Sequence, residues 1–393
     1  FSFPNIVSPA YIKAAVAGKA ISPATGSFTV AMPSTNLSIN TGSVTESYLN
    51  PVVSLVNSET TFSAGSNINI SVSYNTGVSS VGWLDYLELN ARRQLTLSGN
   101  QMLFRDALSA GSGKIAKFML NGGSSSVRIW EVGDPATAKE QQTSLSGSTL
   151  EFTLPADSLR EFIAFNGSTY LTPVSSGKIA NQNIHGTIGQ PDLVIITHPD
   201  FLNEANTLAS FHQSNDSLDV AVVQIYQVYN EFSSGAQDIT AIKDLMRMLY
   251  NRASDSTEMP RYLLLFGDGS YDHKNRLSGN TNFIPTYQSA NSYNPVSTYT
   301  SDDYFGLLDD SEGESPSDDV DIGIGRLPVK SLQAAQAALN KILHYHTPAT
   351  MKSWRNVVTF VADDEDGNIH TDDADLLATM VDTTYNDYDI DKI

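Results

Sequence analysis

The sequence YLLLF (Tyr262–Phe266), followed at once by the polar run GDGSYDH (Gly267–His273), is the clearest indication of the fold class. Five apolar residues without alternation are typical of a strand covered on both faces, as in a parallel sheet flanked by helices. Polar residues directly after such a strand lie at its carboxyl end, where α/β proteins bind ligands. The segment therefore predicts a parallel α/β sheet with a polar edge.

The same pattern recurs on both sides of this stretch. Apolar runs predict strands at Asp192–Thr197, Leu218–Ile225, Ile322–Ile324 and Val357–Val361, and Tyr388–Ile393 resembles the beginning of another strand. Periodic apolar residues predict a helix that begins at Asp238 and another near Leu332–His346, and Asn203 and Thr371 are predicted to cap two further helices. Residues 190–393 are thus expected to form a mostly parallel sheet with helices on both faces. Because the last strand begins where the sequence ends, we expect the natural protein to continue and this domain to be truncated.

Residues 1–175 follow a different pattern. In Asn67–Tyr74 apolar residues alternate with Asn and Ser, which is the period of a strand with one buried face. Similar short runs follow, separated by Gly, Ser and Asn turns. This spacing predicts an antiparallel β-sandwich that precedes the α/β domain.

Charge and composition exclude several classes of protein. The 393 residues carry a net charge of −20 and contain no cysteine. General nucleic-acid binding, disulfide frameworks, thiolate zinc sites and a thiol nucleophile within this chain are therefore not expected. No apolar run is long enough to span a bilayer. The many Ser, Thr, Asn and Gly residues favour an exported protein.

Three predicted strands end in polar residues that could carry chemistry. These ends are His198, Gly267–His273 and Asp363–Asn368. Each alone could be an ordinary turn, where Asp and Gly are common. If all three strands belong to one parallel sheet, the ends converge on one edge and predict a functional site there.

The acidic C-terminal quarter suggests a cation site. Residues 300–393 hold 20 of the 43 Asp and Glu residues. Carboxylates crowded into loops repel one another, and a hard cation such as Ca²⁺ relieves that repulsion. The candidate calcium ligands are Asp302, Asp303, Asp364 and Asp366. The alternative is a solvated acidic surface without a bound ion.

Several motifs, in this order, resemble the gingipain-type cysteine peptidases. They are LDYLELNARRQLTLSGNQMLFRD (Leu84–Asp106), YLLLFGDGSYDHKN (Tyr262–Asn275), IPTYQS (Ile284–Ser289), SDDYFGLLDD (Ser301–Asp310), DIGIGRLPV (Asp321–Val329) and FVADDEDGNIHTDDAD (Phe360–Asp375). The resemblance implies a caspase-like α/β catalytic domain after a β-rich domain. It also implies a His and Cys dyad that would lie beyond residue 393. The chain itself, having no Cys, is predicted to be inactive.

The resemblance assigns roles to two acidic residues. Asp364 matches the acid that supports the catalytic His, and Asp375 matches an acid of the substrate pocket. A carboxylate beside an imidazole fixes its tautomer and stabilises its protonated form. Relatives in this family bind calcium, which the resemblance extends to this chain.

Within the family, the chain is most similar to the sortases of type IX secretion. This likeness implies a cell-surface or outer-membrane endopeptidase that removes the C-terminal sorting domain of secreted cargo proteins, alongside other secretion components. Two alternatives remain open. One is a non-enzymatic platform whose β-sandwich recognises a partner, and the other is a secreted peptidase of broader specificity.

Overall fold

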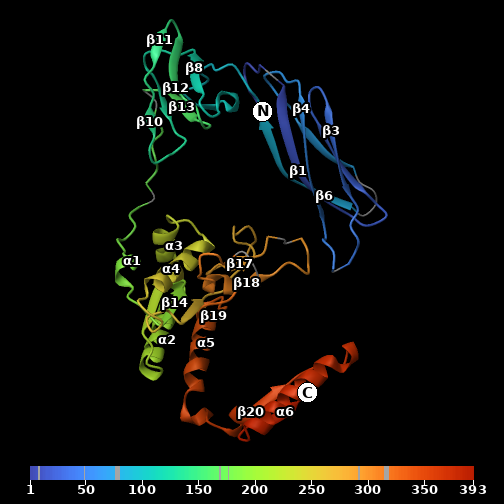
Figure 1. Cartoon of the computed structure of the whole chain (residues 1–393), viewed down its shortest axis with the longest axis vertical. Coiled ribbons are helices and arrows are strands. Elements are labelled where there is room, and N and C mark those ends of the chain that lie inside the picture. The colour runs from blue at the N-terminus through green and yellow to red at the C-terminus, as the bar shows by residue number, and fades with distance from the viewer. Residues whose placement is uncertain are drawn as a thin grey trace. The chain divides into compact units, whose positions relative to one another are not determined.

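The chain divides into two compact units in the computed structural model (Figure 1). The β-rich unit comprises Phe1–Ile179 with Ala290–Thr298, and the α/β unit comprises Ala180–Ser289 with Tyr299–Ile393. The structure describes residues 1–7, 9–47, 49–75, 80–167, 170–175, 177–290, 293–313 and 318–393.

The first β body is built from strands β1–β6. One antiparallel sheet has the order β4-β1-β6, and a second has the order β3-β2-β5. The strands are β1 (Ala10–Ala20), β2 (Gly26–Ala31), β3 (Asn36–Gly42), β4 (Ser54–Phe62), β5 (Ser71–Asn75) and β6 (Ser80–Asn90). Apolar side chains such as Ile12, Phe28 and Ile39 form its core. A Cβ on Gly18 would come within 2.3 Å of the Thr41 hydroxyl, so only glycine fits that close approach.

The second β body has its own core and contains strands β7–β13. Its sheets have the orders β10-β9-β13-β7 and β11-β12-β8. The strands are β7 (Gln101–Arg105), β8 (Ile115–Asn121), β9 (Val127–Glu131), β10 (Lys139–Glu140), β11 (Ser144–Ser146), β12 (Thr149–Pro155) and β13 (Glu161–Asn166). Phe104, Phe118, Phe152 and Phe162 pack together in this core, with ring centroids 5.0–6.4 Å apart.

The antiparallel β-rich region predicted from the sequence is therefore confirmed, but it holds two bodies with separate cores. Alternation shows which face of a strand is buried, and it does not show which strands share a core. The two bodies are joined by the junction segment, residues 91–97. On one side Val7 N–H donates to Arg92 O, and on the other Leu97 N–H donates to Asn121 O.

The α/β unit has a four-stranded parallel sheet of order β15-β14-β16-β19. Its strands are β14 (Leu193–Thr197), β15 (Val220–Gln224), β16 (Tyr262–Phe266) and β19 (Gly323–Leu327). Helices α2 (Leu202–Asn215) and α5 (Leu332–Tyr345) cover one face, and α3 (Ile225–Phe232) and α4 (Ile239–Arg252) cover the other. The predicted parallel sheet with helices on both faces is confirmed, and all five residues of β14 are buried.

Smaller elements lie around this sheet. They are α1 (Ile184–Thr187), the two-stranded antiparallel ribbon of β17 (Tyr287–Gln288) and β18 (Thr300–Ser301), and the 3-10 turns Pro199–Phe201 and Asp303–Gly306. Among the described residues, none of the helices is long and apolar enough to cross a membrane.

Two predicted helix starts are wrong, and the structure contains a helix, α3, that the sequence did not predict. Helix α2 begins at Leu202 after a 3-10 turn whose N-cap is His198, rather than at Asn203. Helix α6 (Ile369–Thr384) begins two residues before Thr371, whose hydroxyl donates instead to the Asp363 carbonyl. Helix α3 follows β15 without a loop, so no turn signal marked it. The predicted Asp238 cap is confirmed, since its carboxylate accepts from Thr240 N–H.

The predicted strand Val357–Val361 forms, but it does not extend the four-stranded sheet. As β20 (Val357–Phe360) it pairs in parallel with β21 (Asp389–Lys392), and α6 packs beside this pair. We call β20, α6 and β21 the C-terminal pair with its helix. An apolar run predicts a strand, but it does not predict which strand will pair with it, because pairing depends on contacts outside the run.

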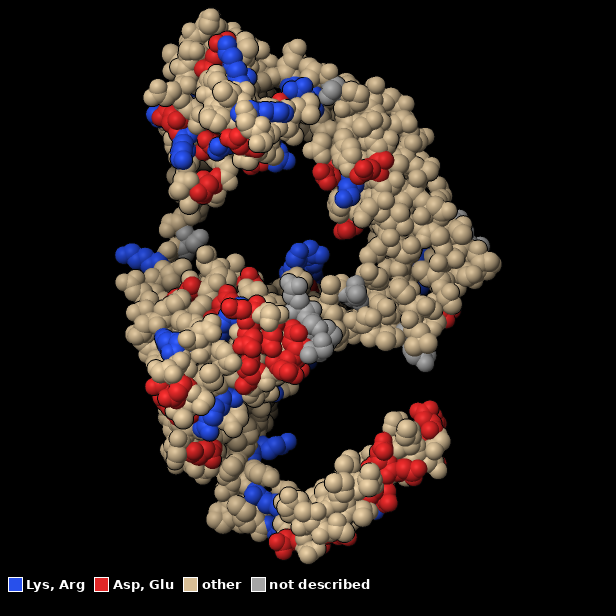
Figure 2. Space-filling view, in the orientation of Figure 1, with Lys and Arg blue, Asp and Glu red and all other residues tan. Residues whose placement is uncertain are grey.

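Charge is divided unevenly between the units. The β-rich unit holds 11 Lys and Arg against 11 Asp and Glu, whereas the α/β unit holds 12 against 32. Figure 2 shows few charged side chains on the first β body and gathered acidic side chains on the α/β unit. The net charge of −20 therefore belongs almost wholly to the second part of the chain.

Glu231 on α3 fastens α1 to the α/β unit. Its carboxylate accepts from Ile184 N–H at 2.6 Å and His185 N–H at 3.0 Å, and the His185 ring lies 2.6 Å away. Burial raises the pKa of Glu231, but the hydrogen bonds from Ile184 and His185 outweigh it and lower the pKa from 4.5 to about 2. The charged carboxylate therefore stabilises the folded state.

We expect this stabilisation to be complete above pH 4.5 and lost as the pH falls towards about 2. Hydrogen exchange of the α1 amides, corrected for intrinsic rates, should speed up over that range. Glu231→Gln should lower α1 protection at pH 6 and remove the pH dependence. Glu140→Gln, at an exposed position in β10, is the control and should leave α1 unchanged. Equal pH profiles for the wild type and Glu231→Gln would contradict the assignment.

Candidate functional site

Two of the three predicted strand ends meet at one edge of the sheet. β14 and β16 are adjacent and parallel, and Thr197 is in register with Phe266. His198 and Gly267 therefore begin neighbouring loops at the same carboxyl edge. The third end, Asp363–Asn368, follows β20, which belongs to a different sheet. The expectation that all three strand ends converge through one sheet is wrong for this third end.

Arg326 of β19 organises the loops at this edge. Its guanidinium donates five hydrogen bonds: two to Asp302 at 2.6 and 2.7 Å, and one each to the carbonyls of Gly267, Ile284 and Pro285 at 2.8–3.1 Å. These bonds use all five guanidinium N–H donors. The Arg326 side chain is only 12% exposed. A buried cation with every donor satisfied fixes the relative positions of the three segments it contacts.

Asp302, a candidate calcium ligand, is bound to Arg326 in this structure. Both carboxylate oxygens accept from Arg326, and Oδ1 also accepts from the Thr286 hydroxyl at 3.0 Å. Its neighbour Asp303 begins the 3-10 turn Asp303–Gly306, and its N–H donates to Ser301 Oγ. The structure thus gives Asp302 a structural cation partner, the guanidinium.

The loop after β16 folds back over the edge of the sheet. The Asp268 carboxylate accepts from the Thr281 hydroxyl at 2.6 Å, and Lys330 Nζ lies 3.5 Å from it. The Asp268 carbonyl accepts from the N–H groups of Phe283 and Ile284. A Cβ on Gly269 would come within 3.0 Å of the Ile284 carbonyl, which explains why glycine stands at this crossing.

Asp272 and His273 do not form a catalytic pair within this loop. The buried Asp272 carboxylate accepts from Leu277 N–H at 2.7 Å, and backbone hydrogen bonds from Arg276 and Leu277 lower its pKa. Ser270 Oγ accepts from Asp272 N–H. These groups hold the loop in shape, and His273 is exposed.

His198 is surrounded by aromatic side chains at the same edge of the sheet. Its ring centroid is 4.8 Å from that of Phe283 and 5.7 Å from that of Tyr226, and its Nδ1 is 3.4 Å from Asp200. Burial lowers the pKa of His198 below its usual value, against the opposing effect of Asp200. The imidazole is therefore neutral at pH 7 and can both donate and accept a hydrogen bond at the edge.

The candidate acids of the C-terminal segment are exposed. Asp366 is 79% exposed and lies 3.7 Å from His370, and Asp375 of α6 is 62% exposed and pairs with Lys392 of β21. Asp364 is also exposed. Among the residues that the structure describes, no three His, Asp or Glu side chains come together as a metal site. The four predicted calcium ligands therefore do not form one ligand set here.

Sequence reasoning missed Arg326, the residue with the most polar contacts at this edge. The available signal was an Arg in an otherwise apolar strand, DIGIGRLPV (Asp321–Val329). A largely buried charged side chain needs a partner of opposite charge, so Asp302 could have been sought. Nothing in the sequence points to the three carbonyl acceptors.

A parallel sheet covered by helices on both faces, with polar loops at its carboxyl edge and a β-rich region before it, is the architecture of a caspase-like peptidase domain. The family model described as "Peptidase family C25" matches residues 187–393, which is more than half of the chain. The chain belongs to this family, and the resemblance found in its motifs is confirmed.

One solved structure extends the likeness into the β-rich unit. The crystal structure of dimeric latent PorU from Porphyromonas gingivalis is 26% identical in sequence, with a TM-score of 0.76. The match covers 90% of this chain and 35% of that chain, so this sequence spans about a third of the length of the protein it matches. A second structure, described as "Structure of Protease", is 15% identical over 44% of this chain and 32% of its own. Its TM-score is 0.32. No curated protein matches significantly.

We expect Arg326→Lys to loosen the carboxyl edge of the sheet. Lysine keeps the charge but cannot supply five donors in fixed directions, so several buried acceptors lose their partners. The free energy of opening of β19 should fall by about 2 kcal/mol, because carbonyl and carboxylate acceptors are left without partners. Hydrogen exchange of β16 and β19 should speed up by about thirtyfold.

Arg261→Lys is the matched control. Arg261 pairs with Asp192 at 3.1 Å, but its side chain is 52% exposed. Such exposed pairs contribute at most about 1 kcal/mol. If the two substitutions had equal effects on β19, the central role of Arg326 would be refuted.

Proposed function

We propose that this protein is a type IX secretion sortase, a cysteine endopeptidase that removes the C-terminal sorting domain of secreted cargo at the cell surface. The observation that carries the proposal is the similarity to PorU across both units, over 90% of this chain. Membership of peptidase family C25 supports the cysteine-peptidase chemistry. The proposed partners are cargo proteins with such sorting domains and other surface components of the secretion system.

In a cysteine peptidase, a thiolate attacks the scissile carbonyl while a histidine moves the proton. This chain has no cysteine, so the residues described here would position the reacting groups. We propose that Asp364 orients the catalytic histidine and that Asp375 contributes to the substrate pocket. Both side chains are exposed and so accessible to such partners, and Asp375 pairs with Lys392 of β21.

We expect the 393-residue chain to have no peptidase activity of its own, because no thiol is present to form an acyl-enzyme. The measurement is cleavage of a reporter protein that carries a sorting domain, followed by mass spectrometry. Cleavage by the purified chain that persists with serine-peptidase and metallopeptidase inhibitors would show that the chemistry is of another kind.

Calcium binding stays a prediction. A cation that binds the folded state alone raises the melting temperature by mass action. If Asp302, Asp303, Asp364 or Asp366 contributes to a site, millimolar Ca²⁺ should raise the melting temperature relative to chelator. Asp364→Asn together with Asp366→Asn should abolish the rise. An unchanged melting temperature would leave only the solvated acidic surface.

The role in secretion is tested in cells that lack the protein. Cargo should then keep its C-terminal sorting domain, and mass spectrometry of cargo C-termini should show the uncut form. Restoring the full-length gene should restore cleavage. Unchanged cargo termini combined with cargo binding by the purified chain would favour the platform alternative. Broad loss of extracellular proteolysis with normal cargo processing would favour a secreted peptidase.

A further inference from the structure

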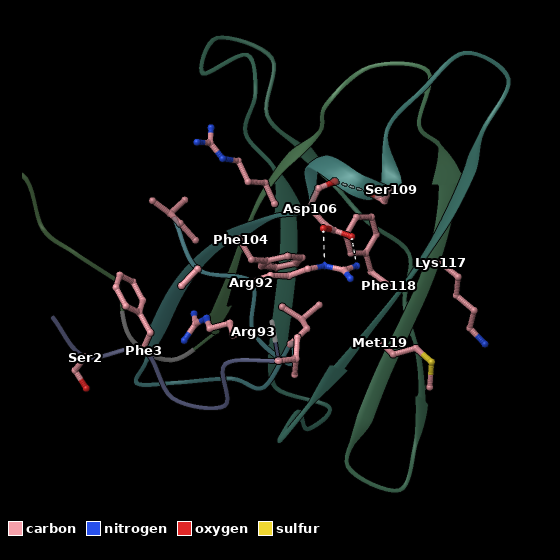
Figure 3. A pocket seen from close by; sticks show the side chains of 15 residues that line it. Ser2, Phe3, Arg92, Arg93, Phe104, Asp106, Ser109, Lys117, Phe118 and Met119 are labelled. Carbon is pink, nitrogen blue, oxygen red and sulfur yellow. Dashed lines mark hydrogen bonds and ion pairs between the residues drawn. The ribbon is translucent and has the colours of Figure 1, made fainter. Parts of the chain in front are cut away.

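A groove opens along one side of the second β body. Its volume is about 660 Å³, and it is lined chiefly by Leu103–Asp106 at β7, Lys117–Met119 of β8 and Ala91–Arg93 of the junction segment (Figure 3). Phe104 and Phe118, whose ring centroids are 6.0 Å apart, line it from the aromatic core. The groove thus gives access to the edge of a packed hydrophobic core.

Both strands that line the groove are the last in their sheets. Within the described parts of the chain, β7 pairs with β13 alone, and β8 pairs with β12 alone except at its last residue, Asn121, which also bonds to the junction segment. Among the described residues, Met102–Arg105 of β7 make no backbone hydrogen bond outside that pairing. An unpaired strand edge offers a row of N–H and C=O groups to an added strand. The side chain of Leu103 is 69% exposed beside this edge.

The groove is cationic in a protein that is strongly acidic. Arg92, Arg93, Arg105 and Lys117 line it, and Asp106 is the one acidic lining residue that the structure describes. Arg92 is bound to Asp106 through two hydrogen bonds of 2.9 and 3.1 Å. Arg105 and Lys117 pair with Glu161 and Glu151 on neighbouring strands.

Arg93 differs from these three cations. It is partly buried, and among the described residues its side chain has no acidic partner. Its backbone is fixed, since Arg93 bridges to Ile6 and the following Gln94 N–H donates to Asn5 O. A cation held at a groove wall without a counter-charge favours an anionic ligand.

The groove is formed before any ligand arrives. The junction segment, residues 91–97, is hydrogen-bonded to residues 5–7 on one side and to Asn121 on the other. Ala91 packs on the core of the first β body, and Leu95 and Leu97 pack on that of the second. A ligand would therefore lose less free energy to ordering the site than it would on a mobile loop.

We propose that this groove binds an extended acidic peptide segment of a partner protein, which adds as a strand to the free edge of β7. Backbone hydrogen bonds to β7 supply the affinity, apolar side chains on one face of the added strand pack beside Phe104, and carboxylates on its other face are attracted by Arg93 and its cationic neighbours. The inference concerns the β-rich unit alone and does not depend on peptidase activity.

The test uses the whole chain and a fluorescein-labelled, end-capped octapeptide of alternating Val and Glu. Fluorescence polarisation at low salt should show binding, although the net charge of −20 repels such a peptide overall. The same peptide with Lys in place of Glu should bind at least tenfold more weakly. So should the acidic peptide with N-methyl groups on alternate amides, because it cannot pair as a strand.

Arg93→Glu should weaken binding of the acidic peptide at least tenfold without a change in melting temperature, since no acidic residue loses its partner. Arg128→Glu, at an exposed β9 residue outside the groove, is the control and should bind as the wild type does. No binding, equal binding of the Lys peptide, or equal effects of the two substitutions would overturn the proposal. Equal affinity for the acidic peptide with and without N-methyl groups would rule out strand addition.

Discussion

The guanidinium of Arg326 joins segments of the α/β unit that lie up to 59 residues apart in sequence. Each of its five N–H groups has an acceptor, so the cost of burying the charge is offset by hydrogen bonds in fixed directions. The loop after β16, the Ile284–Pro285 turn and Asp302 are held to β19 by this one side chain. The position of His198 depends on it indirectly, because Phe283, which packs on His198, precedes the Ile284 carbonyl.

This arrangement also explains why several separated motifs occur together. Gly267 and Gly269 come from YLLLFGDGSYDHKN, Ile284 and Pro285 from IPTYQS, Asp302 from SDDYFGLLDD and Arg326 from DIGIGRLPV. Residues from all four motifs form this guanidinium's hydrogen bonds, and Gly269 lies close beside it. A change in one motif would leave buried polar groups unpaired in the others. The four motifs therefore contribute residues to a single polar network.

The parallel sheet could be predicted because its central strands, β14 and most of β16, are buried on both faces, so that DLVIIT and YLLLF carry no polar residue within the strand core. The pairing of β20 with β21 could not, because register and neighbour depend on contacts outside the strand. The start of α6 was missed because its N-cap, Asn368, has a left-handed backbone (φ 66°) and no side-chain capping bond. For the site, the strand-end rule found His198 and the loop after β16. It could not show that Asp302 is held by Arg326.

The uneven division of charge gives the two units different electrostatic behaviour. A negatively charged surface repels the α/β unit, with 32 acidic residues against 12 basic ones, and hardly affects the β-rich unit, in which 11 basic residues balance 11 acidic ones. The repulsion acts within a Debye length of such a surface, about 8 Å at physiological salt. Salt that screens these carboxylates therefore removes a barrier to adsorption that the α/β unit meets and the β-rich unit does not.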